Sequence, residues 1–199
     1  MHQSVCRQPG LFDAPVNPGL LCLYHCVLSF ATFVFELNTF IFTVTIYRHH
    51  MGMKYRIVPV DTRQPEVVQL LTLLQKACLP ADVVYKITDK EYWYVAYTQN
   101  GEAVGFAGIV PSTRWSDTMY LCRAGVVLAH RGRGLQKKLI KARIRKAKAL
   151  GMTWVITDTN ENPASANSLI STGFKMFEPS QPWGLKTALY WKYKINHAV

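Results

Sequence analysis

The sequence predicts an α/β domain with a mixed sheet. Strand-like and helix-like segments alternate from residue 54 onward, two of the strand-like segments are joined by a hairpin turn, and two helical segments each stop at a glycine. Such alternation is typical of a domain in which helices pack on a sheet. We see no internal repeat and no low-complexity tract.

In the first half, residues 54–59 are strand-like. Residues 65–78 carry apolar side chains at the i, i+3, i+4 and i+7 positions of an amphipathic helix. Residues 92–98 are rich in aromatic and β-branched side chains, which predicts a strand. The dipeptide Asn100-Gly101 predicts a tight turn, so residues 103–110 form the returning strand.

In the second half, residues 119–127 predict a further strand, and residues 135–150 predict a helix that stops at Gly151. A strand at 153–159 follows. A short helix at 163–172 then stops at Gly173, and the last strands are expected around Phe174 and at 188–195.

The composition limits the classes of function. The chain has 199 residues, of which 49% are hydrophobic and 18% charged, and this excludes a disordered protein. A net charge of +11 favours a polyanionic partner, namely nucleic acid, an anionic membrane or a phosphate-bearing cofactor. The 5 cysteines show no paired CxxC spacing and the histidines no metal-ligand spacing, so we expect no metal site and no disulfide framework.

Residues 1–52 differ from the rest. Residues 20–47 are apolar enough to span a bilayer, although Glu36 and Asn38 lie near the middle of that segment. One interpretation is a membrane anchor with the remaining chain in the cytoplasm; another is that residues 1–52 are not part of the working protein; a third is an extra packing segment. We favour the second, which gives a cytoplasmic domain at 53–199.

The strongest functional signal is the turn Arg131-Gly132-Arg133-Gly134-Leu135-Gln136, between a predicted strand and a predicted helix. The glycines allow tight turns and close approach of a ligand to the backbone. Successive N–H groups then converge at a helix N-terminus, which is a site for anions such as pyrophosphate. The turn is not a P-loop, and Lys137 stands where a dinucleotide-binding fingerprint needs its last glycine. Taken alone, it is also compatible with a purely structural turn.

In context, the turn resembles the signature of the GNAT superfamily of N-acetyltransferases, Gln/Arg-x-x-Gly-x-Gly/Ala. Gln136 departs from that signature, because a small residue is usual there. The strand before it is also similar, with Val126 five residues before Arg131, whereas Leu128 replaces a frequent proline. Downstream, Asn162-Pro163-Ala164-Ser165 and Gly173-Phe174 resemble a second block of the family.

The resemblance covers residues 54–199 and implies a mostly antiparallel central sheet flanked by helices. It further implies that acetyl-coenzyme A is the cosubstrate and that a primary amine attacks its thioester directly. The residues that it assigns to coenzyme A are Val126, Val127, Leu128, Arg131, Gly132, Arg133, Gly134, Leu135, Gln136, Asn162 and Ser165. The N–H of Val126 or Val127 is our candidate for stabilising the oxyanion.

The catalytic acid and base are less defined. Leu169 stands where the family often has a tyrosine that acts as the general acid. By residue type, Tyr120 and Tyr190 are substitutes as the acid, and Asp117 is a candidate base acting through water.

The helix after the turn is strongly basic and has no acid. Lys137, Lys138, Lys141, Arg145 and Lys148 share one predicted face, which we interpret as solvated; a 3′-phosphate contact at its first turn and a nucleic-acid surface are the alternatives. The competing function is therefore a GNAT-like binding scaffold that uses this helix for nucleic acid or a protein partner. The sequence leaves open whether the acceptor is a small molecule or a protein, and whether the chain forms a homodimer.

Overall fold

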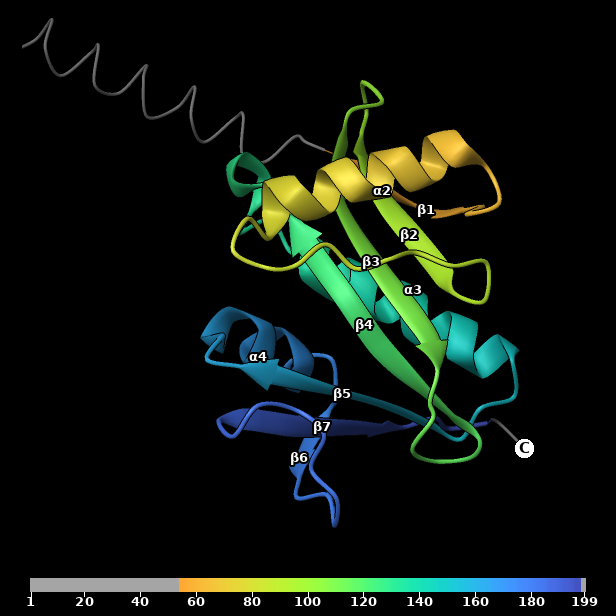
Figure 1. Cartoon of the computed structure of the whole chain (residues 1–199), viewed down its shortest axis with the longest axis vertical. Helices are drawn as coiled ribbons and strands as arrows, with labels where there is room; N and C mark the ends of the chain where they lie inside the picture. The colour runs from red at the N-terminus through yellow and green to blue at the C-terminus, as the bar shows by residue number, and fades with distance from the viewer. Residues whose placement is uncertain (1–53, 198–199) are drawn as a thin grey trace, which may run out of the picture. The chain divides into compact units, whose positions relative to one another are not determined.

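The computed structural model describes residues 54–197, which form a seven-stranded sheet with helices on both faces (Figure 1). The strand order is β1-β2-β3-β4-β5-β7-β6. The elements, in chain order, are β1 (Tyr55–Val60), α2 (Pro65–Cys78), β2 (Tyr92–Thr98), β3 (Ala103–Pro111), β4 (Thr118–Val126), the 3₁₀ turn η1 (Leu128–His130), α3 (Leu135–Ala149), β5 (Trp154–Asn160), α4 (Pro163–Ile170), β6 (Lys175–Phe177) and β7 (Ala188–Lys194).

All neighbouring strands run antiparallel except β4 and β5, which pair in parallel. Each face of the sheet has its own core. Leu71 and Leu74 of α2 pack on Trp93 and Phe106 on one face, whereas Leu135 and the rest of the apolar face of α3 pack on the other, together with α4. The predicted mixed, mostly antiparallel sheet with flanking helices is confirmed.

The strands β4 and β5 separate soon after they begin. Their pairing consists of Thr118–Trp154, Met119–Val155 and Tyr120–Ile156. Beyond it, the Thr157 hydroxyl donates to the Leu121 carbonyl at 2.9 Å, and the two strands then diverge (Figure 1). The carboxyl half of β4 therefore has a neighbour on the β3 side only, which leaves an opening in the middle of the sheet.

A β-bulge in β4 lies beside this opening. The β3–β4 register shifts between Ala107 and Ile109, so two residues of β4, Cys122 and Arg123, lie opposite Gly108. Arg143 of α3, whose guanidinium lies in the core, bonds both strands there: its Nη1 donates to Gly108 O at 3.1 Å and to Cys122 O at 3.3 Å. Burial lowers the pKa of Arg143 to about 10.

The predicted elements agree with the observed ones to within about two residues. The predicted solvated face of α3 is exposed at all five of its positions, and Leu135, Leu139, Ile140 and Ala147 are buried opposite. The predicted hydrophobic segment at 20–47 lies outside the described residues. Within residues 54–197, no helix is both long enough and apolar enough to cross a bilayer.

Candidate active site

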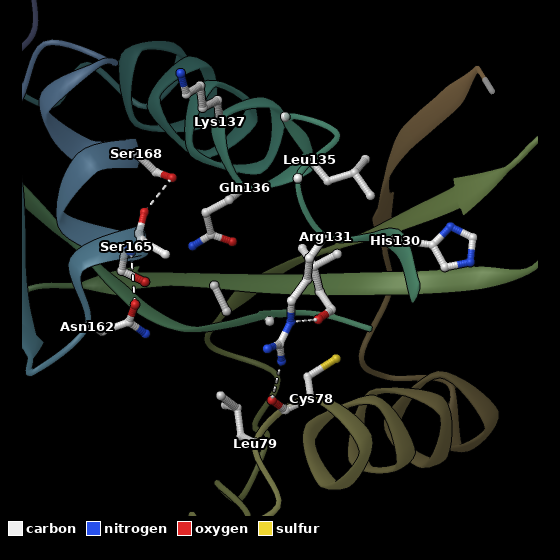
Figure 2. Close-up of a pocket in the computed structure, with 16 residues that line it drawn as sticks. Cys78, Leu79, His130, Arg131, Leu135, Gln136, Lys137, Asn162, Ser165 and Ser168 are labelled. Atoms are coloured by element: carbon white, nitrogen blue, oxygen red, sulfur yellow. Dashed lines mark hydrogen bonds between the residues drawn. The ribbon is translucent and has the colours of Figure 1, made fainter. Parts of the chain in front are cut away.

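A cavity of about 510 Å³ lies at the opening, where four parts of the chain meet. These are the end of α2, the end of β4, the turn at 131–134 with the start of α3, and the first turns of α4. Its lining contains eight of the predicted coenzyme-binding residues: Val126, Arg131, Gly132, Gly134, Leu135, Gln136, Asn162 and Ser165. Figure 2 shows Gln136 and Lys137 of α3 across from the polar side chains of α4.

The turn places the start of α3 at the cavity because two of its residues have left-handed backbone. Gly132 has φ 74° and Gly134, the N-cap of α3, has φ 72°, a region that strongly favours glycine. A Cβ at either position would meet no atom within 4 Å, so the space beside both is open. Lys138 donates to Gly134 O at 3.2 Å, and the three preceding N–H groups of α3 have no intrahelical acceptor. The turn thus presents free donors and open space, as an anionic ligand requires.

Arg131 connects this turn to α2. Its Nε donates to Val126 O at 2.9 Å, and one terminal nitrogen reaches Cys78 O at 3.4 Å. In Figure 2 the side chain crosses the cavity toward Cys78. Arg131 therefore holds the end of β4 against the end of α2 while its charge lies in the cavity.

Arg133 points away from the cavity and does not line it. Its Nη1 donates to the Tyr55 hydroxyl at 2.9 Å, and the same hydroxyl is 3.1 Å from Nδ1 of His130. The predicted cofactor role of Arg133 is thus not a direct side-chain contact in this structure; the residue anchors the turn to β1. Val127 and the exposed Leu128 are likewise absent from the lining.

The first turn of α4 provides the opposite wall. Asn162 is its N-cap, and its Oδ1 accepts from Ser165 N at 3.0 Å. Ser168, one turn later, donates its hydroxyl to Ala164 O at 2.8 Å and also faces the cavity. These small polar groups suit an elongated polar ligand arm.

The backbone of β4 decides between the two oxyanion candidates. Val127 N donates to Val104 O at 2.9 Å, so its N–H is already used. Antiparallel pairs alternate between hydrogen-bonded and non-bonded, and Val126 lies opposite Gly105 in the next, non-bonded pair. The N–H of Val126 therefore points away from β3 and into the opening.

On the other face of the sheet, the structure brings together Tyr120, Tyr190 and an acid that we did not predict, Asp158 of β5. Tyr120 donates its hydroxyl to Asp158 Oδ1 at 2.6 Å, and Trp183 Nε1 donates to the same oxygen at 2.8 Å. Tyr190 lies opposite Asp158 in the β5–β7 register, and its hydroxyl accepts from Gly184 N at 2.9 Å. Burial and the bond to Asp158 raise the pKa of Tyr120 well above its usual range, so the phenol stays protonated.

Asp117 lies elsewhere. It precedes β4 at the end where β4 and β5 are paired, is exposed, and its carbonyl accepts from Thr153 N and Trp154 N. Its φ of 50° marks it as a turn residue. The structure does not bring this predicted base to the opening.

Sequence reasoning missed Cys78, Ser168 and Asp158. Only Asp158 carried a usable signal, because it is a carboxylate within an otherwise apolar and hydroxylated strand. Among the described residues, no cluster of three His, Cys, Asp or Glu side chains could hold a metal ion.

Residues 62–174 match the model of the acetyltransferase (GNAT) family. No curated protein sequence matches the chain. A Bacillus subtilis acetyltransferase solved in complex with CoA is 17% identical, with a TM-score of 0.55 over 72% of this chain and 100% of that one.

Two further solved structures are similar in fold. The Escherichia coli ribosomal-protein-S18-alanine N-acetyltransferase is 15% identical, with a TM-score of 0.56 over 73% of this chain and 97% of that one. A chain of the NatC complex bound to Gag peptide and CoA is 19% identical, with a TM-score of 0.56 over 72% of this chain and 99% of that one.

Proposed function

The chain belongs to the GNAT family of acetyltransferases, and from that premise we propose that it transfers an acetyl or other short acyl group from acetyl-coenzyme A to a primary amine. The amine attacks the thioester directly, because a thioester is already activated and needs no covalent enzyme intermediate. The main contribution of the protein is then to hold both reactants in the opening between β4 and β5.

The observation that carries this proposal is the start of α3. The two left-handed glycines leave open space beside unpaired helical N–H groups, and the cavity has the volume of a small-molecule site. Because a helix N-terminus favours negative charge, the N–H groups of Leu135, Gln136 and Lys137 would hold the pyrophosphate of the coenzyme. The Lys137 side chain adds a positive charge at the same end. Gln136, the departure from the family signature, lines the cavity.

The other predicted cofactor residues have complementary roles. Arg131 adds charge within the cavity, and Asn162, Ser165 and Ser168 offer polar contacts to the pantetheine arm. The Val126 N–H, directed into the opening, would bind the thioester carbonyl oxygen, where negative charge develops during attack. Arg133 and Leu128 support this site through the shape of the turn.

Detection of the bound coenzyme tests the proposal. Native mass spectrometry of the purified protein is expected to show bound coenzyme A or acetyl-coenzyme A, and titration with the free coenzyme should saturate at one site per chain. A screen of amines, peptide N-termini and aminoacyl-tRNA with labelled acetyl-coenzyme A would then identify the acceptor. A folded protein that binds no coenzyme would overturn the proposal; one that binds it and transfers to no acceptor would favour the scaffold alternative.

A further inference from the structure

The carboxylate of Asp158 has an unusual environment. Its two hydrogen-bond donors, the Tyr120 hydroxyl and the Trp183 indole N–H, are both neutral, and both bond to Oδ1. In the described part of the chain, no ion pair involves Asp158, although the protein carries a net charge of +11. Because buried charges are ordinarily paired, a half-buried carboxylate whose donors are both neutral is a candidate site for a cation.

The alternation of side chains along the strands shows on which face of the sheet Asp158 lies. Met119 and Leu121 pack in the core on the α3 side, so the intervening Tyr120 points to the opposite face. Val155 likewise faces α3, and Asp158, an odd number of residues later, shares the face of Tyr120. Both side chains thus lie where the strands begin to diverge, on the face of the sheet opposite α3, and neither lines the coenzyme cavity.

The surroundings of Asp158 are mainly aromatic. The ring of Trp183 meets that of Tyr190 edge-on at 4.5 Å, and Phe177 lies 6.3 Å from Trp183. A Cβ on Gly184 would meet Ala188 Cβ at 2.7 Å and would lie 3.4 Å from Asp158 Oδ2, so the chain at Gly184 passes close to the carboxylate. The charged or titratable groups nearest this cluster are Cys122, beside Tyr120, Arg114, 5.6 Å from the centre of the Trp183 ring, and Lys192, 5.0 Å from the centre of the Phe177 ring.

We propose that Asp158 is the acceptor site: its carboxylate binds the ammonium group of a primary amine on the face opposite the coenzyme, and with Tyr120 it carries the protons of the reaction. This inference rests on the proposed acyltransferase function and deepens it. It identifies the acceptor as an amine whose reacting nitrogen is protonated when it binds, next to aromatic side chains. It also supplies the base and the acid that the family resemblance left undefined.

The ammonium group loses two protons during the reaction. Asp158 takes a first proton from the ammonium and passes it to water. The neutral amine attacks the thioester carbonyl carbon; the C–N bond forms, and the C–S bond breaks with its electron pair left on sulfur. Asp158 takes the second proton from nitrogen, Tyr120 donates its hydroxyl proton to sulfur, and Asp158 returns a proton to Tyr120. The products are an amide, the coenzyme thiol and one proton in water.

The test compares two probes of equal shape, benzylamine and benzyl alcohol, on protein saturated with coenzyme A. The indole N–H signal of Trp183, labelled with ¹⁵N and assigned with Trp183→Phe, reports binding next to Asp158. We expect benzylamine to shift this signal saturably and to bind at least tenfold more tightly than the alcohol. Asp158→Asn should abolish the preference, Asp158→Glu should restore part of it, and Glu178→Gln, which removes an exposed carboxylate near Phe177, should leave it unchanged.

Measurements of turnover distinguish the role of Asp158 from that of Tyr120. With benzylamine as acceptor, Tyr120→Phe should keep the amine preference but lower kcat at least tenfold, whereas Asp158→Asn should raise KM for the amine as well. Equal binding of amine and alcohol, no binding of either, or an intact preference in a folded Asp158→Asn protein would overturn the inference. Failure of the wild type to bind coenzyme A would instead overturn the proposed function, so the two failures are distinguishable.

Discussion

Nη1 of Arg143, buried on α3, donates a hydrogen bond of 3.1 Å to the carbonyl oxygen of Gly108 in β3. The same nitrogen reaches Cys122 O on β4, so one side chain bonds both strands at the bulge. The bulge lies between the paired end of β4 and the Val126 N–H that faces the opening. Arg143 is thus part of the support for the site, although it contacts no ligand.

Replacing Arg143 with methionine should lower the free energy of unfolding by about 2 kcal/mol, because it removes two hydrogen bonds to strand carbonyls in the core. Urea denaturation followed by circular dichroism would measure the change. The control is Arg145→Met on the exposed face of the same helix, for which we expect a change within about 0.5 kcal/mol. Equal destabilisation by both substitutions would show that the bonds to the bulge do not matter.

A chain starting at Met53 should fold and bind coenzyme A as the full chain does. All the described elements, from β1 to β7, and the complete lining of the cavity lie after that residue. Size-exclusion chromatography and a coenzyme titration of the shortened chain would check this. Aggregation of the shortened chain, together with a full chain that needs detergent for extraction, would favour the membrane-anchor interpretation.

Replacing Lys141, Arg145 and Lys148 by glutamine in one triple variant should change the affinity for coenzyme A by no more than about twofold. At about 1.5 Å rise per residue, Lys148 lies about 20 Å along α3 from Leu135, too far to contact the pyrophosphate. Lys137→Gln, at the first turn, should weaken binding measurably. The measurement is calorimetric titration of each variant with coenzyme A.

The same triple variant tests the nucleic-acid alternative. If the basic face is only solvated, RNA and DNA should bind weakly to both wild type and variant at two salt concentrations. Tight, salt-sensitive binding by the wild type that is lost in the variant would establish a nucleic-acid surface and favour the scaffold or an RNA-borne acceptor.

The sequence predicted the elements well because their signals are local. Apolar periodicity, the Asn100-Gly101 turn and the glycines that end the helices each depend on neighbouring residues. The glycine turn at 131–134 was also predictable, since a strand, two glycines and a helix in succession leave few other geometries.

The remaining features depend on residues far apart in the chain. Asp158 meets Tyr120 across 38 positions, and Arg143 reaches Gly108 across 35. The sequence predicted a solvated face for five of the basic residues of this helix and gave no position for Arg143, which lies in the core because only the fold creates the bulge it bonds. The direction of Arg133 likewise follows from Tyr55 on a strand that begins 78 residues earlier.

The most direct test of the coenzyme site is calorimetric titration of coenzyme A into Gly134→Asp and its matched control, Gly101→Asp. Both glycines have left-handed backbone, with φ 72° and 84°, and open space beside Cα, so both variants bear a similar strain of about 1 kcal/mol. Only Gly134→Asp places a carboxylate at the start of α3, and a repulsion of about 3 kcal/mol against the pyrophosphate predicts roughly 100-fold weaker binding. Gly101→Asp should bind as the wild type does. Unchanged affinity in a folded Gly134→Asp protein would contradict the assignment of the coenzyme to this turn.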